Sequence, residues 1–70
     1  MSAGSLGRIA IVGAGQAGTM LGLALRASGV ATEIALHDRD TATAGRSLAR
    51  GAGDRVCARV EEAFGADVLI

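Results

Sequence analysis

The spacing of apolar residues along the chain changes several times, and each change predicts a new element. Residues 8–12 are a nearly unbroken apolar run rich in β-branched side chains, which indicates a strand covered on both faces of a parallel sheet. A second strand is expected at residues 33–37. Between them, residues 16–28 have the spacing of an amphipathic helix, which Gly29 ends as a C-cap. The helical face expected against the sheet comprises Leu21, Ala24, Leu25 and Ser28.

The alternation of strands and helices continues to the end of the sequence. A second helix, a third strand, a short helix of one or two turns and a fourth strand are expected at residues 41–50, 55–58, 60–64 and 67–70. Thr41 is expected to cap the second helix, and Ala44, Leu48 and Ala49 are expected to face inward. Strands that alternate with helices form parallel sheets with right-handed crossovers, so the sequence predicts an α/β fold of order βαβαβαβ.

The first turn carries the most informative motif of the chain, Gly-Ala-Gly-Gln-Ala-Gly, directly behind the first apolar run. A strand, a glycine-rich turn and a helix form the geometry that holds the pyrophosphate of a dinucleotide. The first glycine lets the chain turn, the second lets the phosphate approach the backbone, and the third lets the helix pack closely on the strand. Free N–H groups and the helix dipole then attract the phosphates. The residues predicted to bind the cofactor here are Gly13, Ala14, Gly15, Gln16, Ala17 and Gly18.

Gly22 follows Gly18 by one helical turn and extends the same close-packing face. Glycine inside a helix costs about 1 kcal/mol relative to alanine, so both positions require a packing or binding reason. Tight packing without a ligand is the alternative interpretation of these glycines. The surrounding order of strand, turn, helix and strand favours dinucleotide binding.

The length of 70 residues is short for the fold that this motif indicates. A domain of this size buries only about 60% of its unfolded surface, and a complete dinucleotide-binding sheet needs about twice the length. We therefore expect an incomplete Rossmann-type parallel sheet with flanking helices. Residues 8–70 are expected to form the N-terminal part of the dinucleotide-binding domain, and residues 1–7 a disordered leader.

An acidic residue, Asp38, ends the second predicted strand, 20 positions after Gly18. A carboxylate there accepts hydrogen bonds from the ribose hydroxyls and repels a 2′-phosphate, which favours NAD over NADP. Arg39 is expected to stack on the adenine or, in another rotamer, to accept a 2′-phosphate. Asp40 is interpreted as part of the cap of the next helix, and His37 as a hydrogen-bonded structural histidine rather than a catalytic base.

Composition excludes several classes of partner. Seven basic and seven acidic residues give a net charge of zero, and the basic residues, all arginine, are scattered, so neither nucleic acid nor a membrane surface is an expected partner. The single cysteine, Cys57, cannot form an internal disulfide and is interpreted as a small core residue. No metal site, membrane span or signal peptide is recognised, so a cytoplasmic protein is expected.

Residues 8–70 resemble the N-terminal half of NAD-dependent dehydrogenases, most closely the prephenate and arogenate dehydrogenase group. That group has a helix, a Gly-x-x-Asp, a short strand and an Ala-Asp-hydrophobic strand, which here correspond to residues 47–54, 60–63 and 66–70. The resemblance implies a dehydrogenase that acts on a small carboxylic acid and is a homo-oligomer at full length. Substrate-binding and proton-transfer residues would lie beyond Ile70, so no catalytic residue is assigned, and the 70 residues alone are expected to be inactive, with weak or no NAD affinity.

Three alternatives remain. The lactate and malate dehydrogenases show similar stretches at residues 29–34 and 42–45, although their distance from the acidic residue to the Ala-Asp strand is usually longer. Non-catalytic NAD-sensing domains of potassium-transport systems share a Gly-x-Gly-Gln-x-Gly turn. FAD-dependent monooxygenases have a similar first strand, turn and helix but usually carry Glu at the position of Asp38.

Overall fold

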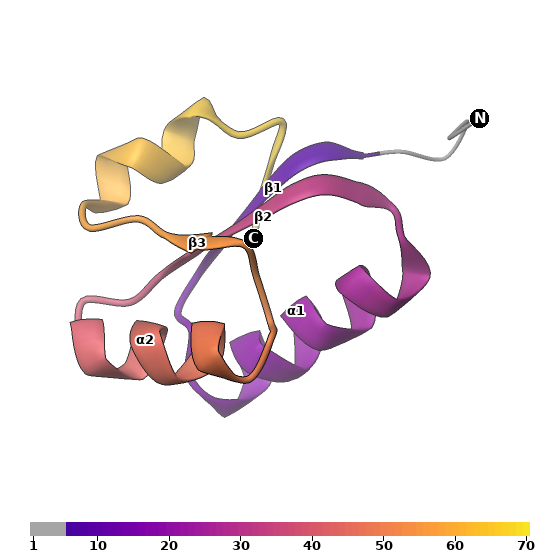
Figure 1. The fold of residues 1–70 in the computed structure, drawn as a ribbon. Helices are drawn as coiled ribbons and strands as arrows, with labels where there is room; N and C mark the ends of the chain where they lie inside the picture. Colours follow the sequence, from indigo (N-terminus) through magenta and orange to yellow (C-terminus); the bar gives the residue numbers. More distant parts are fainter. Residues whose placement is uncertain (1–5) are drawn as a thin grey trace.

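The protein has an α/β architecture in which helices cover both faces of a parallel sheet (Figure 1). The structure is a computed structural model, and it describes residues 6–70. The predicted fold class is therefore confirmed. Part of the expected leader, residues 1–5, lies outside the described residues. The elements in chain order are β1 (Gly7–Val12), α1 (Gln16–Ser28), β2 (Ala31–His37), α2 (Thr41–Ala49), β3 (Arg55–Val56), the 3₁₀ helix η1 (Val60–Gly65) and β4 (Val68–Leu69).

The four strands lie in the order β3-β2-β1-β4, and every pair is parallel. In the central pair, Ile9 lies opposite Ile34, and Val12 lies opposite His37. The chain moves outward from β1 to β3 and then crosses to the other side of β1. This reversal of direction creates a crevice at the carboxyl ends of the strands, which is where open α/β sheets bind their ligands.

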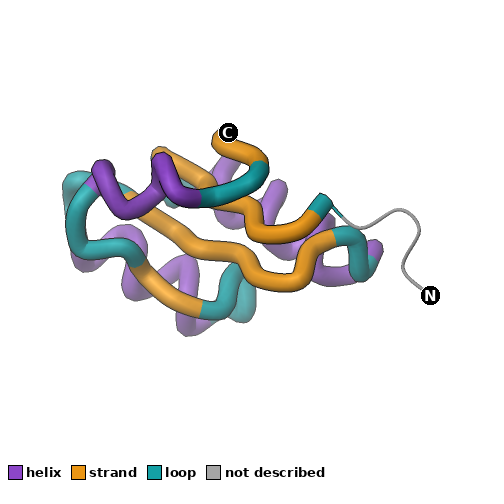
Figure 2. The backbone as a smooth tube through the Cα atoms, turned by 90° about the horizontal axis from the view of Figure 1, so that it is seen from above, coloured by secondary structure: helices purple, strands orange, loops and turns teal. Residues whose placement is uncertain are grey.

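Two unequal layers cover the sheet. Helices α1 and α2 lie on one face and η1 lies on the other, so that in Figure 2 η1 lies in front of the strands and the two longer helices lie behind them. The main core is on the side of α1 and α2. Its buried members are Ile9, Ile11, Ala14, Ile34, Leu36, Ala44 and Ala52.

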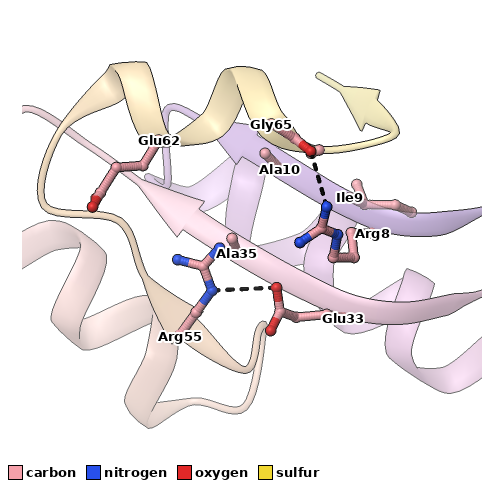
Figure 3. Close-up of a pocket in the computed structure, with 9 residues that line it drawn as sticks. Arg8, Ile9, Ala10, Glu33, Ala35, Arg55, Glu62 and Gly65 are labelled. Carbon is pink, nitrogen blue, oxygen red and sulfur yellow. Dashed lines mark hydrogen bonds and ion pairs between the residues drawn. The ribbon is translucent and has the colours of Figure 1, made fainter.

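The opposite face of the sheet is lined with small residues at its centre and charged residues at its rim. Ala10 and Ala35 are almost completely buried, and η1 packs over this face with its buried residue Ala63. A hollow of about 100 Å³ remains, and Figure 3 shows that arginine and glutamate side chains surround it. The guanidinium of Arg55 donates to Glu33 at 3.2 Å across this rim. Arg55 and Glu33 therefore neutralise each other at this rim.

The face of α1 that approaches the sheet differs from the predicted one. Thr19 and Gly22 are the buried residues of this helix, whereas Ala24 and Ser28 are exposed. The reason is steric, because a Cβ at Gly18 would collide with the carbonyl oxygen of Gly13, and one at Gly22 with that of Ala52. The helix is closest to the rest of the protein along its glycines. The leucines Leu21 and Leu25 flank that contact and are partly buried.

The prediction for α2 also needs two corrections. Asp40, not Thr41, is the N-cap, and its carboxylate accepts a hydrogen bond from the N–H of Ala42 at 3.1 Å. The inward face contains Ala44 and Ser47, whereas Ala49 is exposed.

Both later strands are shorter than expected, with two residues each, although neighbouring residues continue their hydrogen bonds. The N–H of Cys57 donates to Leu36 at 2.7 Å, and that of Ile70 donates to Ala10 at 2.9 Å. The C-cap of α1 was predicted correctly, because Gly29 has the left-handed φ of 69° that this position favours.

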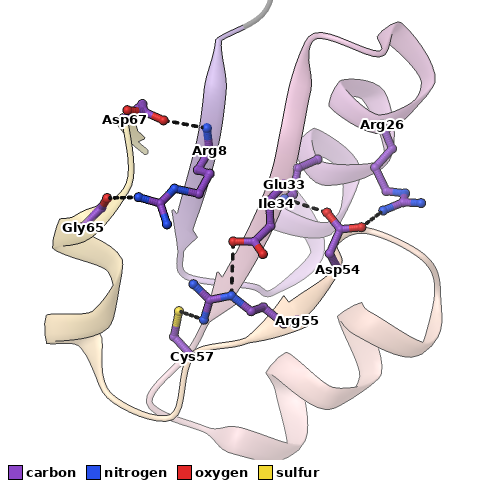
Figure 4. A network of polar contacts seen from close by, with 9 residues as sticks. All are labelled: Arg8, Arg26, Glu33, Ile34, Asp54, Arg55, Cys57, Gly65 and Asp67. Carbon is purple, nitrogen blue, oxygen red and sulfur yellow. Dashed lines mark hydrogen bonds and ion pairs between the residues drawn. The ribbon is translucent and has the colours of Figure 1, made fainter.

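A polar network ties the amino-terminal ends of the strands to the loops around them (Figure 4). Asp54 accepts a hydrogen bond from the N–H of Ile34 at 2.7 Å and pairs with Arg26 of α1. Asp67 accepts one from the N–H of Arg8 at 2.8 Å, which attaches the segment before β4 to β1. These carboxylates thus replace ladder hydrogen bonds at the sheet margin.

Asp54 makes the stability of the fold dependent on pH. The Ile34 N–H holds the pKa of Asp54 below its ordinary value of 3.8, against a partial opposing effect of burial, and Arg26 adds to the lowering. A carboxylate with a lowered pKa stabilises the fold above its unfolded pKa, and this contribution is lost as the pH falls through the folded pKa. We expect Asp54→Ala to lower the free energy of unfolding by about 1 kcal/mol near pH 7, a modest amount because the side chain is partly exposed. At about pH 2 the free energy of unfolding should change little.

Urea unfolding of the wild type and the variant at both pH values measures this difference. Glu61→Ala is the matched control, because its ion pair with Arg59 is largely exposed. A loss for Asp54→Ala that is equally large at acidic pH would show that the charge is not responsible.

Candidate functional site

The turn between β1 and α1 presents bare backbone amides at the carboxyl edge of the sheet. Gly13 has a left-handed φ of 97°, and its N–H donates to His37 of β2 at 2.8 Å. Gly15 is the N-cap of α1 and, being glycine, provides no side-chain cap; the first turn of the helix contains no acidic residue. The N–H of Thr19 is bonded within the helix, to the carbonyl oxygen of Gly15 at 2.8 Å. The amides of residues 16–18 come before Thr19 and lie at the N-terminal end of the helix. This end of a helix is where anions bind.

The three glycines of the motif have three different environments. A Cβ at Gly18 would collide with the turn itself, so this glycine serves packing. A Cβ at Gly13 would meet nothing within 4 Å, but the left-handed φ disfavours any other residue. At Gly15 a Cβ also meets nothing within 4 Å, and φ is −72°, so neither sterics nor conformation of the fold requires glycine there. A ligand that lies against the backbone would supply that requirement.

Asp38 lies directly beside this turn. One carboxylate oxygen accepts a hydrogen bond from the N–H of Ala14 at 3.0 Å, and the other accepts one from Asp40 at 2.9 Å. The structure therefore brings the glycine turn and the acidic residue together across 24 positions of sequence. A carboxylate has about four acceptor positions, so lone pairs remain for hydroxyl groups of a ligand.

Asp40 has a separate role. Hydrogen bonds hold its pKa below the ordinary value, first from the Thr43 hydroxyl and then from the N–H groups of Ala42 and Thr43. Its carboxylate is therefore engaged at the start of α2, as the sequence predicted, and Asp38 is the acidic residue that faces the turn.

An open hollow of about 410 Å³ continues from Asp38 along the carboxyl ends of β1 and β2. Most of the atoms exposed on its walls are apolar. The residues that line it are Val12, Gly13, His37, Asp38, Arg39 and Val60. Arg39 is exposed, so its guanidinium is available to cover a flat ring. Sequence reasoning did not assign Val12 and Val60 to the site. The available signal was that apolar residues at the end of one parallel strand and shortly after another meet at the same edge.

His37 and Cys57 have structural roles. The imidazole Nδ1 lies 2.9 Å from the carbonyl oxygen of Cys57, and both residues are buried. This agrees with the interpretation of His37 as a hydrogen-bonded histidine and of Cys57 as a core residue. Within residues 6–70, no cluster of three or more His, Cys, Asp or Glu side chains is arranged to hold a metal ion.

No protein-family model, no curated protein and no solved structure matched the chain when it was compared with them. Among the helices of residues 6–70, none has the length and apolar character needed to cross a membrane.

Proposed function

We propose that this chain binds the adenosine and pyrophosphate part of NAD and belongs to an NAD-dependent dehydrogenase acting on a small carboxylic acid. The observation that carries the cofactor assignment is the 3.0 Å hydrogen bond from the Ala14 amide to the Asp38 carboxylate. It holds the Asp38 carboxylate beside the N-terminal end of α1, and this arrangement supports a ribose contact next to a pyrophosphate contact. A packing role alone accounts for Gly18 and Gly22 but not for the open Gly15.

Each predicted site residue has a defined part in this proposal. The amides of Gln16, Ala17 and Gly18 bind the pyrophosphate, aided by the positive end of the helix dipole. Asp38 accepts hydrogen bonds from the ribose hydroxyls. The adenine ring lies in the apolar hollow between Arg39 and Val60, which both line it.

The chemistry of a bound nicotinamide cofactor is hydride transfer. The residues of this chain bind and orient the adenosine end, and none of them is assigned to the reacting centre. The prephenate-like substrate class rests on the sequence resemblance, which covers residues 8–70.

Activity is tested by mixing the full-length protein with NAD and a panel of hydroxy acids, prephenate and arogenate, while the absorbance of NADH is recorded. Turnover of one of these acids is the expected result. Saturable NAD binding without turnover of any of them would contradict the dehydrogenase assignment and favour an NAD sensor. A yellow preparation with flavin absorbance bands would contradict NAD as the cofactor.

Asp38→Asn tests the ribose contact separately from the phosphate contact. The amide oxygen still accepts the hydrogen bond from Ala14, so the glycine turn should keep its shape, whereas the hydrogen bond from the Asp40 N–H is lost because an amide NH2 cannot accept it. We expect NAD to bind about tenfold more weakly, because a neutral acceptor replaces a charged one. NADP should bind more tightly than to the wild type, because repulsion of its 2′-phosphate is removed. Calorimetric titration of the full-length protein with both cofactors measures the two changes, and an unchanged ratio of affinities would exclude Asp38 from the ribose site.

A further inference from the structure

The buried imidazole of His37 uses only one of its two nitrogens within the fold. His37 is the last residue of β2 and is 9% exposed, and its Nδ1 lies 2.9 Å from the carbonyl oxygen of Cys57. Among residues 6–70 this is the only hydrogen bond of the ring. The Nε2 atom therefore has no partner in the part of the chain that the structure describes.

The partner of Nδ1 determines the tautomer of the ring. A carbonyl oxygen has lone pairs but no hydrogen, so it only accepts, and Nδ1 must carry the hydrogen of this bond. In a neutral imidazole the other nitrogen is then unprotonated. The Nε2 atom of His37 is consequently a hydrogen-bond acceptor.

This acceptor is accessible from the hollow beside Asp38. Within the described residues, no fully buried side-chain nitrogen or oxygen lacks a hydrogen-bond partner, so the unpartnered Nε2 must be open to solvent or to a ligand. His37 lines the hollow of about 410 Å³ together with Val12, Arg39 and Val60. The lone pair of Nε2 is therefore presented to a hollow whose walls are mostly apolar.

A single acceptor in an apolar hollow discriminates between ligands by the group that they place against it. An N–H or O–H group of a ligand gains a hydrogen bond from Nε2, whereas a ligand carbonyl oxygen at the same point leaves two acceptors unpaired. The same hollow is the proposed site of the adenine ring. Adenine carries an amino group at position 6, where guanine and hypoxanthine carry an oxygen.

We propose that Nε2 of His37 accepts a hydrogen bond from the 6-amino group of adenine and makes the site selective for 6-aminopurine over 6-oxopurine dinucleotides. This inference rests on the proposed dinucleotide site and assigns a specificity-determining residue to it. The hydrogen bond from Nδ1 to Cys57 fixes the ring, so the acceptor is in place before the base arrives. His37 thus has a binding role in addition to its structural hydrogen bond.

The test compares NAD with its deaminated analogue, nicotinamide hypoxanthine dinucleotide, which has an oxygen in place of the 6-amino group. Both are titrated calorimetrically into the full-length protein at about pH 8, where imidazole groups are ordinarily neutral. We expect the wild type to bind NAD about tenfold more tightly, because NAD gains a hydrogen bond where the analogue leaves an acceptor unpaired.

Two variants of His37 separate the roles of its two nitrogens. In His37→Asn the side-chain NH2 can still donate to the Cys57 carbonyl, but no atom takes the place of Nε2. In His37→Gln the longer side chain can place an amide oxygen where Nε2 was, but the Cys57 carbonyl loses its donor. His37→Asn should therefore bind both dinucleotides about equally, whereas His37→Gln should keep the preference for NAD and melt at a lower temperature.

Val60→Ala is the matched control, because it changes the hollow without changing a polar group. It should weaken the binding of both dinucleotides alike and keep the wild-type ratio, and thermal melts verify the folding of all variants. Saturable NAD binding with equal affinity for the analogue in the wild type, or a preference that persists in His37→Asn, would overturn this inference and leave the proposed function standing. Absence of binding by either dinucleotide would overturn both.

Discussion

Gly15→Val is expected to leave the domain folded and to weaken NAD binding by about a hundredfold. The fold tolerates the side chain, because a Cβ at this position meets nothing within 4 Å and φ is −72°. The branched side chain would occupy the space through which a phosphate approaches the amides of residues 16–18. Loss of two charge-assisted hydrogen bonds amounts to about 3 kcal/mol, or roughly a hundredfold in affinity.

Calorimetric titration of the full-length protein with NAD measures the loss, and a thermal melt verifies folding. Gly45→Val is the matched control, because a Cβ at Gly45 of α2 also meets nothing within 4 Å and this residue lines none of the hollows described above. Equal affinities for the wild type and Gly15→Val would show that the pyrophosphate does not bind at this turn.

Gly22→Ala is expected to act on the fold, in contrast to Gly15→Val. It should lower the free energy of unfolding strongly, because the added methyl group disturbs the packing of α1. The added methyl group would collide with the carbonyl oxygen of Ala52, and backbone on both sides prevents a cheap adjustment. Overpacking of this kind costs about 1–3 kcal/mol, and a core of this size rarely supplies more than about 3–5 kcal/mol. The variant should therefore be close to its unfolding transition at room temperature.

The same substitution at Gly45 provides the comparison. Gly45 lies inside α2 with open space around it, so Gly45→Ala should raise the free energy of unfolding by about 0.5–1 kcal/mol through helix propensity alone. Urea unfolding of the two variants measures both effects. A stabilising Gly22→Ala would show that α1 does not approach the loop at Ala52 as closely as the structure has it.

The order of elements and most of their positions follow from local sequence patterns. Residues 16–28 were predicted as a helix with the bounds that the structure gives α1, because a glycine turn precedes it and Gly29 follows it. The strand order β3-β2-β1-β4 has no comparable local signal, since it depends on where the chain crosses the sheet.

The predictions from sequence are wrong where two local signals compete. In α1 the leucine spacing and the Gly18 and Gly22 pair indicate different faces, and the structure follows the glycines because only they permit close backbone contact. At the start of α2, Asp40 and Thr41 are both good caps, and the side-chain hydrogen bond to Ala42 decides for Asp40.

The candidate site was accessible from sequence only in part. The glycine turn and Asp38 are found by spacing, because the acidic residue ends the strand that neighbours β1. The place of Val60 in the site depends on how η1 packs, which no local pattern specifies.

The most direct test of the proposed site is a titration of the nitrogen-15-labelled full-length protein with NAD, in which the chemical shifts of the backbone amides are followed. Saturable changes are expected at the amides of residues 13–18 and at Asp38, where the turn and the Asp38 carboxylate meet. Little change is expected at Arg26 and Asp54, at the opposite ends of the strands. Changes that are absent, or that occur mainly around Asp54, would contradict dinucleotide binding at the glycine turn.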